Sequence, residues 1–215
     1  MSAEARLYLI TPVLDDASFA ARLAEACATG AVAAVLLRLG ASDERGLINL
    51  VKAYGPAVQD HDAALIVGAD GNADLANVVA RGGADGAHIA GDPARVRDLR
   101  DRLKAERAIG VGAIRTKDDA MSLGEAGADY LLFGEPRPDG SLPSLESVVE
   151  RAAWWAEIFE TPCVAYAPSL DAVEALAATG AEFIAIADAV WSHPDGPAAA
   201  VKAAAAILDR LGAAG

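Results

Sequence analysis

The sequence predicts an α/β fold, a single (β/α)8 barrel over residues 1–215, because of a repeated motif and the spacing of its copies. The motif is Gly-Ala, one further residue and an apolar run, and its copies begin at Gly30, Gly83, Gly127 and Gly180. The copies lie 53, 44 and 53 residues apart. Each interval holds about two β-α units of ~25–30 residues. Four pairs of units give the eight strands of a closed barrel.

The apolar runs after the motif are predicted to be strands two, four, six and eight. They are short and unbroken, as expected of parallel strands that are buried on both faces. They read AVLLR at 34–38, GAHIA at 86–90, YLLFG at 130–134 and FIAIA at 183–187. Each motif glycine follows an amphipathic stretch, so we expect it to end a helix in the left-handed conformation.

The other elements fall between these runs. The odd-numbered strands are predicted at 7–11, closed by Pro12, and at 63–68, 108–112 and 163–166. Helices are predicted at 15–28, 43–59, 72–81, 93–105, 117–126, 142–159, 169–178 and 197–212. Asp15-Asp16, Ser42-Asp43-Glu44 and Thr116–Asp119 mark three helix starts, since their side-chain oxygens can accept free backbone N–H groups.

Composition narrows the functional class. The formal net charge of −13 predicts an acidic surface and disfavours nucleic acid or an anionic membrane as a partner. Cys27 and Cys163 are expected to be buried free thiols, which suits a reducing compartment. The N-terminus shows no signal-peptide pattern, and no apolar run reaches the ~18 residues of a membrane span. We therefore expect a cytoplasmic protein that binds a small molecule and forms a homodimer.

The active site of such a barrel forms at the carboxyl ends of its strands. The residues predicted there are Thr11, Arg38, Asp70, Asp92, Arg115, Glu135, Tyr166 and Asp188, together with His88 inside strand four. The four acids among them could hold Mg²⁺ or supply an acid and a base. Alternatively, Asp92 caps the helix that begins at Pro93, and Asp188 is a loop residue that faces solvent.

Arg38, His88 and Trp191 each admit two interpretations. Arg38 ends an apolar strand, where it could grip a phosphate or carboxylate in a fork, or form an ion pair with an acid such as Asp70. His88 is either a hydrogen-bonded core histidine or a catalytic base. Trp191 follows strand eight and could line a pocket or belong to the packing.

Several segments together resemble the thiamine phosphate synthase and thiazole tautomerase family. They are LYLIT, LLR, ADLA, GADGAHIAGD and GADYLLFG, in the family's order over roughly residues 6–190. The resemblance implies a (β/α)8 barrel. For synthase members it implies a transferase of thiamine biosynthesis that joins a pyrimidine diphosphate to a thiazole phosphate with Mg²⁺ and releases pyrophosphate. Tautomerase members aromatise the thiazole phosphate with a histidine near the end of a strand.

The resemblance assigns roles to three residues. Arg38 matches the arginine of the family's second strand, and Asp70 and Asp92 fall near its two Mg²⁺-binding aspartates, Asp92 one residue early. Other family motifs are replaced in this chain. Leu36 and Gly40 stand where the family's second strand has a glutamine and a lysine, and Gly110–Gly112 stands in place of Gly-Val-Ser. Glu135–Asp139 replaces the Thr-x-Thr-Lys clamp, Tyr166–Ser169 replaces the Gly-Gly phosphate turn, and Asp188 replaces a serine after strand eight.

Loss of these phosphate-binding motifs predicts that the family reaction is weak or absent in this chain, because such clamps are usually the largest catalytic contribution. Two alternatives remain open. One is a diverged enzyme that acts on a non-phosphorylated or cationic small molecule with the acids and His88. The other is a non-catalytic, ligand-binding or regulatory paralogue.

Overall fold

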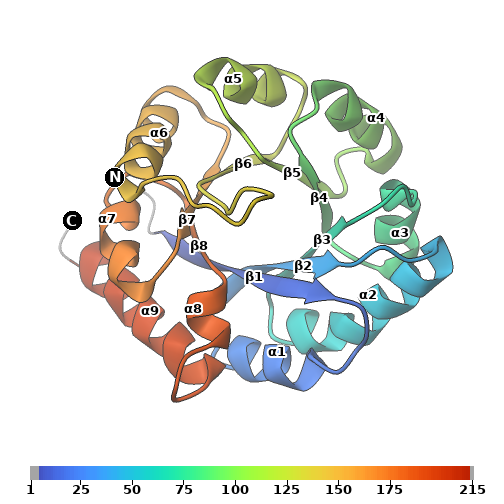
Figure 1. Cartoon of the computed structure of the whole chain (residues 1–215), viewed down its shortest axis with the longest axis horizontal. Helices are drawn as coiled ribbons and strands as arrows, with labels where there is room; N and C mark the ends of the chain where they lie inside the picture. Colours follow the sequence, from blue (N-terminus) through green and yellow to red (C-terminus); the bar gives the residue numbers. More distant parts are fainter. Residues whose placement is uncertain (1–4, 214–215) are drawn as a thin grey trace.

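Eight parallel strands close into a barrel in the order in which they occur along the chain, in a computed structural model that describes residues 5–213 (Figure 1). The strands are β1 (Arg6–Leu14), β2 (Val32–Leu39), β3 (Ala64–Ala69), β4 (Gly86–Ala90), β5 (Ala108–Gly112), β6 (Tyr130–Phe133), β7 (Cys163–Ala167) and β8 (Phe183–Ile186). The barrel closes because β1 pairs with both β2 and β8. The predicted fold class is confirmed.

The helices surround the barrel (Figure 1). They are α1 (Ala20–Cys27), α2 (Glu44–Gln59), α3 (Leu75–Gly82), α4 (Pro93–Leu103), α5 (Lys117–Glu125), α6 (Leu145–Ile158), α7 (Val173–Ala177), α8 (Asp188–Trp191) and α9 (Pro197–Gly212). None of the helices within residues 5–213 is both long and apolar enough to span a membrane. Cys27 and Cys163 are buried and free, as predicted.

The glycines of the repeated motif adopt the predicted conformation. Their φ angles are +73°, +82°, +99° and +88° at Gly30, Gly83, Gly127 and Gly180, and each glycine lies between a helix and an even-numbered strand. Side chains with a Cβ rarely adopt this conformation, so the motif requires glycine at this position. The repeat therefore marks β2, β4, β6 and β8.

The acidic third residue of the motif has a structural role that the sequence pattern did not predict. Asp85 Oδ2 accepts the backbone N–H of Leu65 at 2.7 Å, and Asp129 Oδ2 accepts that of Ile109 at 2.6 Å. Glu182 bonds the first backbone N–H of β7 in the same way, at 2.8 Å. Each acid thus joins an even-numbered strand to the start of the preceding odd-numbered one, where a strand end leaves a donor unpaired.

The barrel interior is filled by side chains of very different sizes. Tyr8 and Tyr130 are 2% and 8% exposed and lie in one inner cluster with aliphatic side chains from the other strands. Gly110 on β5 makes room for this packing, because a Cβ at that position would overlap the ring of Tyr130. A glycine on β5 is therefore paired with a tyrosine on β6, and the ring of the tyrosine fills the space beside the glycine.

We predict that Gly110→Ala destabilises the protein by roughly 1–3 kcal/mol, because the added methyl group overpacks the interior against Tyr130. Gly68→Ala on β3 is the matched control: its Cβ would stand 3.4 Å from the His88 carbonyl oxygen, an ordinary contact. Urea denaturation of both variants tests the prediction. Equal stability of the two variants would show that the barrel interior adjusts freely.

Two element boundaries near the N-terminus were predicted wrongly. β1 does not close at Pro12 but continues to Leu14, with a register shift against β2 between Ile10 and Val13 that accommodates a residue without an N–H. α1 begins at Ala20, not at residue 15. The carboxylate of Asp16 instead accepts the N–H of Ser18 at 2.8 Å and holds a turn.

The C-terminal half holds further differences. The predicted helix at 169–178 is a short 3-10 turn followed by α7, and α6 begins at Leu145 because Ser144 caps it. α8 was not predicted, so Asp188 is the first residue of a short helix and not a loop residue. Trp191, on this helix, is buried and donates its indole N–H to the Ile10 carbonyl at 2.6 Å. It therefore belongs to the packing and does not line the cavity described below.

Candidate ligand-binding site

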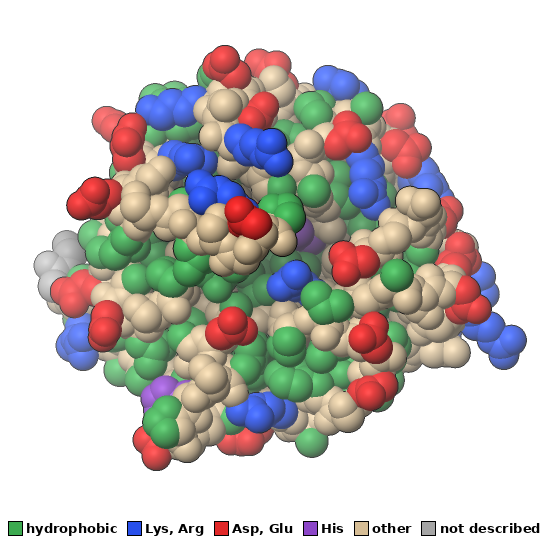
Figure 2. All heavy atoms as spheres, viewed as in Figure 1, with side chains coloured by type: hydrophobic (Ala, Val, Ile, Leu, Met, Phe, Trp, Pro, Cys, Tyr) green, Lys and Arg blue, Asp and Glu red, His purple; other side chains and the backbone are tan. Residues whose placement is uncertain are grey.

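A cavity of about 700 Å³ opens at the carboxyl ends of the strands. Figure 2 shows this end of the molecule hollowed near the barrel axis, with charged side chains of both signs around the hollow. A cavity of this size suits a small-molecule ligand. Its position is where barrels of this class place their active sites.

Seven of the nine predicted site residues line this cavity: Thr11, Arg38, Asp70, His88, Glu135, Tyr166 and Asp188. Asp92 and Arg115 are not among the lining residues. Asp92 caps α4, because its Oδ1 accepts the N–H groups of Ala94 at 2.9 Å and Arg95 at 3.3 Å. The capping interpretation therefore describes Asp92, and Arg115 is an exposed residue between β5 and α5.

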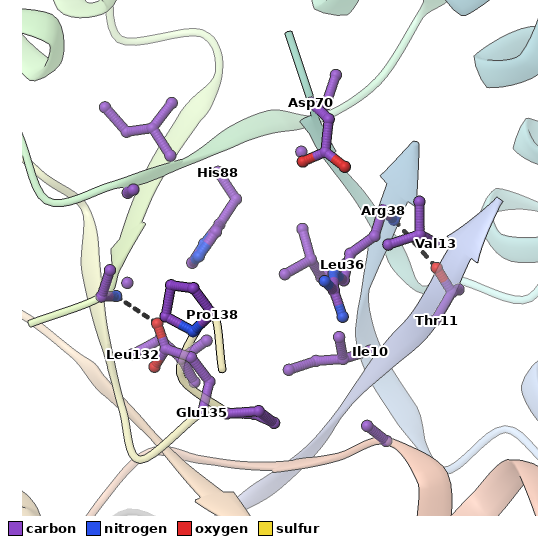
Figure 3. Close-up of a pocket in the computed structure, with 18 of the residues that line it drawn as sticks. Ile10, Thr11, Val13, Leu36, Arg38, Asp70, His88, Leu132, Glu135 and Pro138 are labelled. Carbon is purple, nitrogen blue, oxygen red and sulfur yellow. Dashed lines mark hydrogen bonds between the residues drawn. The ribbon is translucent and has the colours of Figure 1, made fainter. Parts of the chain in front are cut away.

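Arg38 extends from β2 into the middle of the cavity, between Ile10 and Leu36 (Figure 3). Its backbone N–H donates to the hydroxyl of the fully buried Thr11 at 3.0 Å, which fixes the end of the strand. None of the ion pairs within residues 5–213 involves Arg38. The guanidinium is therefore available to a ligand, and the predicted alternative of an ion pair with Asp70 is wrong.

Asp70 lies at the rim of the cavity, just after β3, with its carboxylate turned toward the cavity (Figure 3). Its backbone N–H donates to the Leu39 carbonyl at 3.0 Å, which ties this loop to β2. Within the described part of the chain, no three His, Cys, Asp or Glu side chains group closely enough to hold a metal by themselves. Asp70 is thus the one of the two aspartates in the resemblance that faces the cavity.

Two more arginines line the cavity, and neither was predicted from the sequence. Arg95 belongs to the first turn of α4, and Arg137 belongs to the segment between β6 and α6. This segment, drawn in yellow, crosses the open end of the barrel (Figure 1). It turns tightly at residues 137–140, where Gly140 donates its N–H to the Arg137 carbonyl at 2.8 Å. The sequence Arg-Pro-Asp-Gly is typical of such a turn and could have revealed it.

His88 is connected to two buried tyrosines. Its Nδ1 lies 3.0 Å from the Tyr130 hydroxyl, which lies 2.7 Å from the Tyr8 hydroxyl. Burial, and to a lesser extent the charge of Arg38, lowers the pKa of His88 to about 4. Burial raises the pKa of Tyr8 and Tyr130. All three side chains are therefore neutral near pH 7.

Glu135 lies on the same side of the cavity as His88 (Figure 3). Its Oε1 accepts the backbone N–H of Ala113. Gly112 provides the space, since a Cβ there would collide with the Glu135 carboxylate and lie 2.9 Å from His88 Nε2. Burial raises the pKa of Glu135, while the Ala113 N–H and the charge of Arg38 act in the opposite direction.

We predict that His88 stays neutral between about pH 5 and pH 8 and takes up a proton only near a pKa of about 4, because burial disfavours the charged imidazole. Histidine NMR shifts recorded against pH measure this directly. In Arg38→Met the pKa should rise, since a neighbouring positive charge is removed, but remain below the usual value. A midpoint near the unperturbed ~6.5 in the wild type would contradict the prediction.

These features define the class of protein: a (β/α)8 barrel with a small-molecule cavity at the carboxyl ends of its strands, lined by three arginines. The family model described as "Thiamine monophosphate synthase" matches residues 7–190. The chain belongs to this family.

Similar proteins agree with the assignment. The chain is 38% identical to the thiamine-phosphate synthase of Rhodospirillum centenum, with 92% of this chain and 95% of that protein covered. It is 35% identical to the thiamine-phosphate synthase of Hyphomonas neptunium, with 96% and 95% covered. The fold is similar to the structure titled thiamine phosphate pyrophosphorylase from Pyrococcus furiosus, with a TM-score of 0.77, 21% identity and coverage of 97% of this chain and 98% of that one.

Proposed function

We propose that this protein makes thiamine phosphate by joining a pyrimidine diphosphate to a thiazole phosphate, with release of pyrophosphate, and that it does so more slowly than relatives with the complete phosphate motifs. Relatives named thiamine-phosphate synthase over nearly the whole chain support this proposal. The observation that carries it is the set of three arginines, Arg38, Arg95 and Arg137, that line one cavity.

The arginines suit the charge changes of this reaction. The bond between the pyrimidine's methylene carbon and the diphosphate oxygen breaks, and the pyrophosphate leaves with the electron pair. The thiazole nitrogen supplies the pair for the new carbon–nitrogen bond. Negative charge grows on the leaving oxygen, so fixed positive groups near it lower the barrier. Arginine also binds phosphate oxygens in a fork, which orients them.

Of the two aspartates that the resemblance assigns to Mg²⁺, Asp70 is the one that fits a metal in this cavity. Mg²⁺ in proteins is often held by one or two carboxylates together with substrate phosphates and water. Asp70 faces the cavity, whereas the Oδ1 of Asp92 is occupied by two N–H groups of α4. When bound there, Mg²⁺ would neutralise part of the diphosphate charge.

The proline that follows β7 and the aspartate at the start of α8 are the reasons for a lower rate. Pro168 follows β7 and has no N–H to donate to a phosphate. Asp188 is exposed at the rim of the cavity, where it repels an anion. The segment between β6 and α6 supplies one positive charge to the cavity, that of Arg137.

The direct experiment mixes the purified protein with pyrimidine diphosphate, thiazole phosphate and Mg²⁺, and detects thiamine phosphate by fluorescence after oxidation to the thiochrome. We expect turnover that is absent without protein and below that of a relative from the same family assayed in parallel. No product above the protein-free control would refute the proposal.

A second function is favoured by the three carboxylates of the same cavity, Asp70, Glu135 and Asp188. They suit a cationic or non-phosphorylated ligand. A thermal-shift titration separates the two functions, since a ligand that binds only the folded state raises the melting temperature. Stabilisation by pyrophosphate supports the synthase, whereas stabilisation by unphosphorylated thiamine and by no phosphate supports the second function. Stabilisation by the substrates without turnover would indicate a binding protein.

A further inference from the structure

The cavity has a polar corner that is less exposed than its charged rim. His88 and Glu135 form this corner beside Leu132, and Arg38 lies across the cavity from them, between Ile10 and Leu36 (Figure 3). Asp70, Arg95 and Asp188 are exposed at the rim of the cavity, whereas His88 and Glu135 are partly buried. A ligand with a flat apolar ring and a charged tail would place the ring inward and the tail outward.

The buried tyrosines determine which nitrogen of His88 carries the proton. Tyr8 is 2% exposed, and Tyr130 is its hydroxyl's only hydrogen-bond partner among residues 5–213. If the proton of His88 were on Nδ1, it would point at Tyr130, Tyr130 would donate to Tyr8, and the Tyr8 proton would have no acceptor. In the opposite order, Tyr8 donates to Tyr130 and Tyr130 donates to Nδ1, so every hydroxyl proton is accepted.

The second order leaves the proton of neutral His88 on Nε2, the nitrogen on the Gly112 side of the ring, beside Glu135. His88 is then a fixed hydrogen-bond donor. Glu135 is the acceptor next to it, since its carboxylate has about four lone-pair sites and the Ala113 N–H takes one of them. The corner therefore presents one donor and one acceptor side by side, and the charge of Arg38 acts on both of these side chains.

We propose that His88 and Glu135 together select a heteroaromatic ring in which a ring nitrogen adjoins an amino-bearing carbon, as in an aminopyrimidine. The ring nitrogen accepts the Nε2 proton, and the amino group donates to the Glu135 carboxylate. The identification of this ring with the pyrimidine substrate rests on the proposed function. Glu135 is then the residue that distinguishes the amino-bearing pyrimidine from analogues without the amino group.

The test compares two uncharged probes that contain no phosphate: the aminopyrimidine alcohol of the substrate and the same molecule with hydrogen in place of the amino group. Affinities are measured by ligand-observed NMR titration of the full-length protein. We expect the wild type to bind the amino compound more tightly by roughly tenfold or more. The probe that lacks the amino group leaves the Glu135 carboxylate, a hydrogen-bond acceptor, without a partner. Glu135→Leu should remove the preference, and Glu135→Gln should restore part of it through the amide oxygen.

Glu146→Leu is the matched control. Glu146 is an exposed carboxylate in the first turn of α6 and does not line the cavity, so this variant should keep the wild-type preference. A preference that is equal in wild type and Glu135→Leu, or a wild type that binds the two probes equally or binds neither, overturns the inference. Retained discrimination without thiamine phosphate synthesis would refute the proposed function and leave this inference standing.

Tyr130→Phe examines the tautomer separately, because it removes the hydroxyl that donates to Nδ1. Nitrogen-15 shifts of His88 should show the proton on Nε2 in the wild type and a mixture of both forms in the variant. A protein that only lost packing would keep a single tautomer. A wild type with its proton on Nδ1 would overturn the donor role of His88.

Discussion

Replacing Arg38 by methionine should lower kcat/KM for thiamine phosphate synthesis by about 10²–10³-fold, the largest loss expected of any single variant of the site. Arg38 points into the middle of the cavity and takes part in none of the ion pairs of residues 5–213. No acid among the described residues holds the guanidinium within ion-pair distance, so it can bind the phosphate groups of the proposed substrates. Methionine keeps much of the side-chain length and removes only the charge and its fork of donors.

Arg115→Met is the matched control for this prediction. Both arginines lie near the carboxyl end of a strand, at the same end of the barrel, but Arg115 does not line the cavity. We expect Arg115→Met to keep kcat/KM within about twofold, because surface substitutions away from a site have small effects. Steady-state assays with varied pyrimidine diphosphate, together with melting temperatures, test both variants. A similar loss in both, or a loss below about threefold in Arg38→Met, would contradict the role of Arg38.

The barrel could be predicted from the sequence because its signals are local. The end of a helix at Gly83 and the apolar run of β4 that follows it can be recognised from a few neighbouring residues. The path of β1 through Pro12 could not be predicted in this way. A proline usually ends a strand, and the register shift that accommodates it depends on the partner strand β2.

The candidate site was predictable only where a side chain lies at or directly after the end of a strand. Arg38 and Asp70 meet this condition, and both reach the cavity. Arg95 reaches it from a helix and Arg137 from a tight turn, so a search of strand ends passes over both. Asp92 meets the condition in sequence, but its carboxylate turns to the free N–H groups of α4.

The buried hydrogen-bond chain shows a further limit of prediction. Tyr8 and Tyr130 are 122 residues apart in sequence, and nothing local to either tyrosine predicts their contact. Their meeting depends on barrel closure, which brings the interiors of β1 and β6 together, and on Gly110, which provides space for the Tyr130 ring. The protonation of His88 follows from this arrangement, so it too is a property of the closed fold.

Replacing Asp70 by asparagine should raise the Mg²⁺ concentration for half-maximal activity by roughly 10–100-fold, because the one cavity-facing aspartate of the resemblance loses its charge. Asparagine keeps the size of the side chain, and the bond from the backbone N–H of this position to the Leu39 carbonyl is unaffected by the exchange. Thiamine phosphate synthesis measured against Mg²⁺ concentration, at saturating pyrimidine diphosphate, gives this value.

Asp92→Asn is the control that separates the two aspartates. Asparagine caps helices about as well as aspartate, so this variant should keep both its stability and its Mg²⁺ dependence. If Asp92→Asn shifted the Mg²⁺ dependence as far as Asp70→Asn, the Asp92 carboxylate would have to leave the N-terminus of α4 and turn into the cavity during the reaction. If the Mg²⁺ dependence of Asp70→Asn equalled that of the wild type, Asp70 would not be a ligand of the metal.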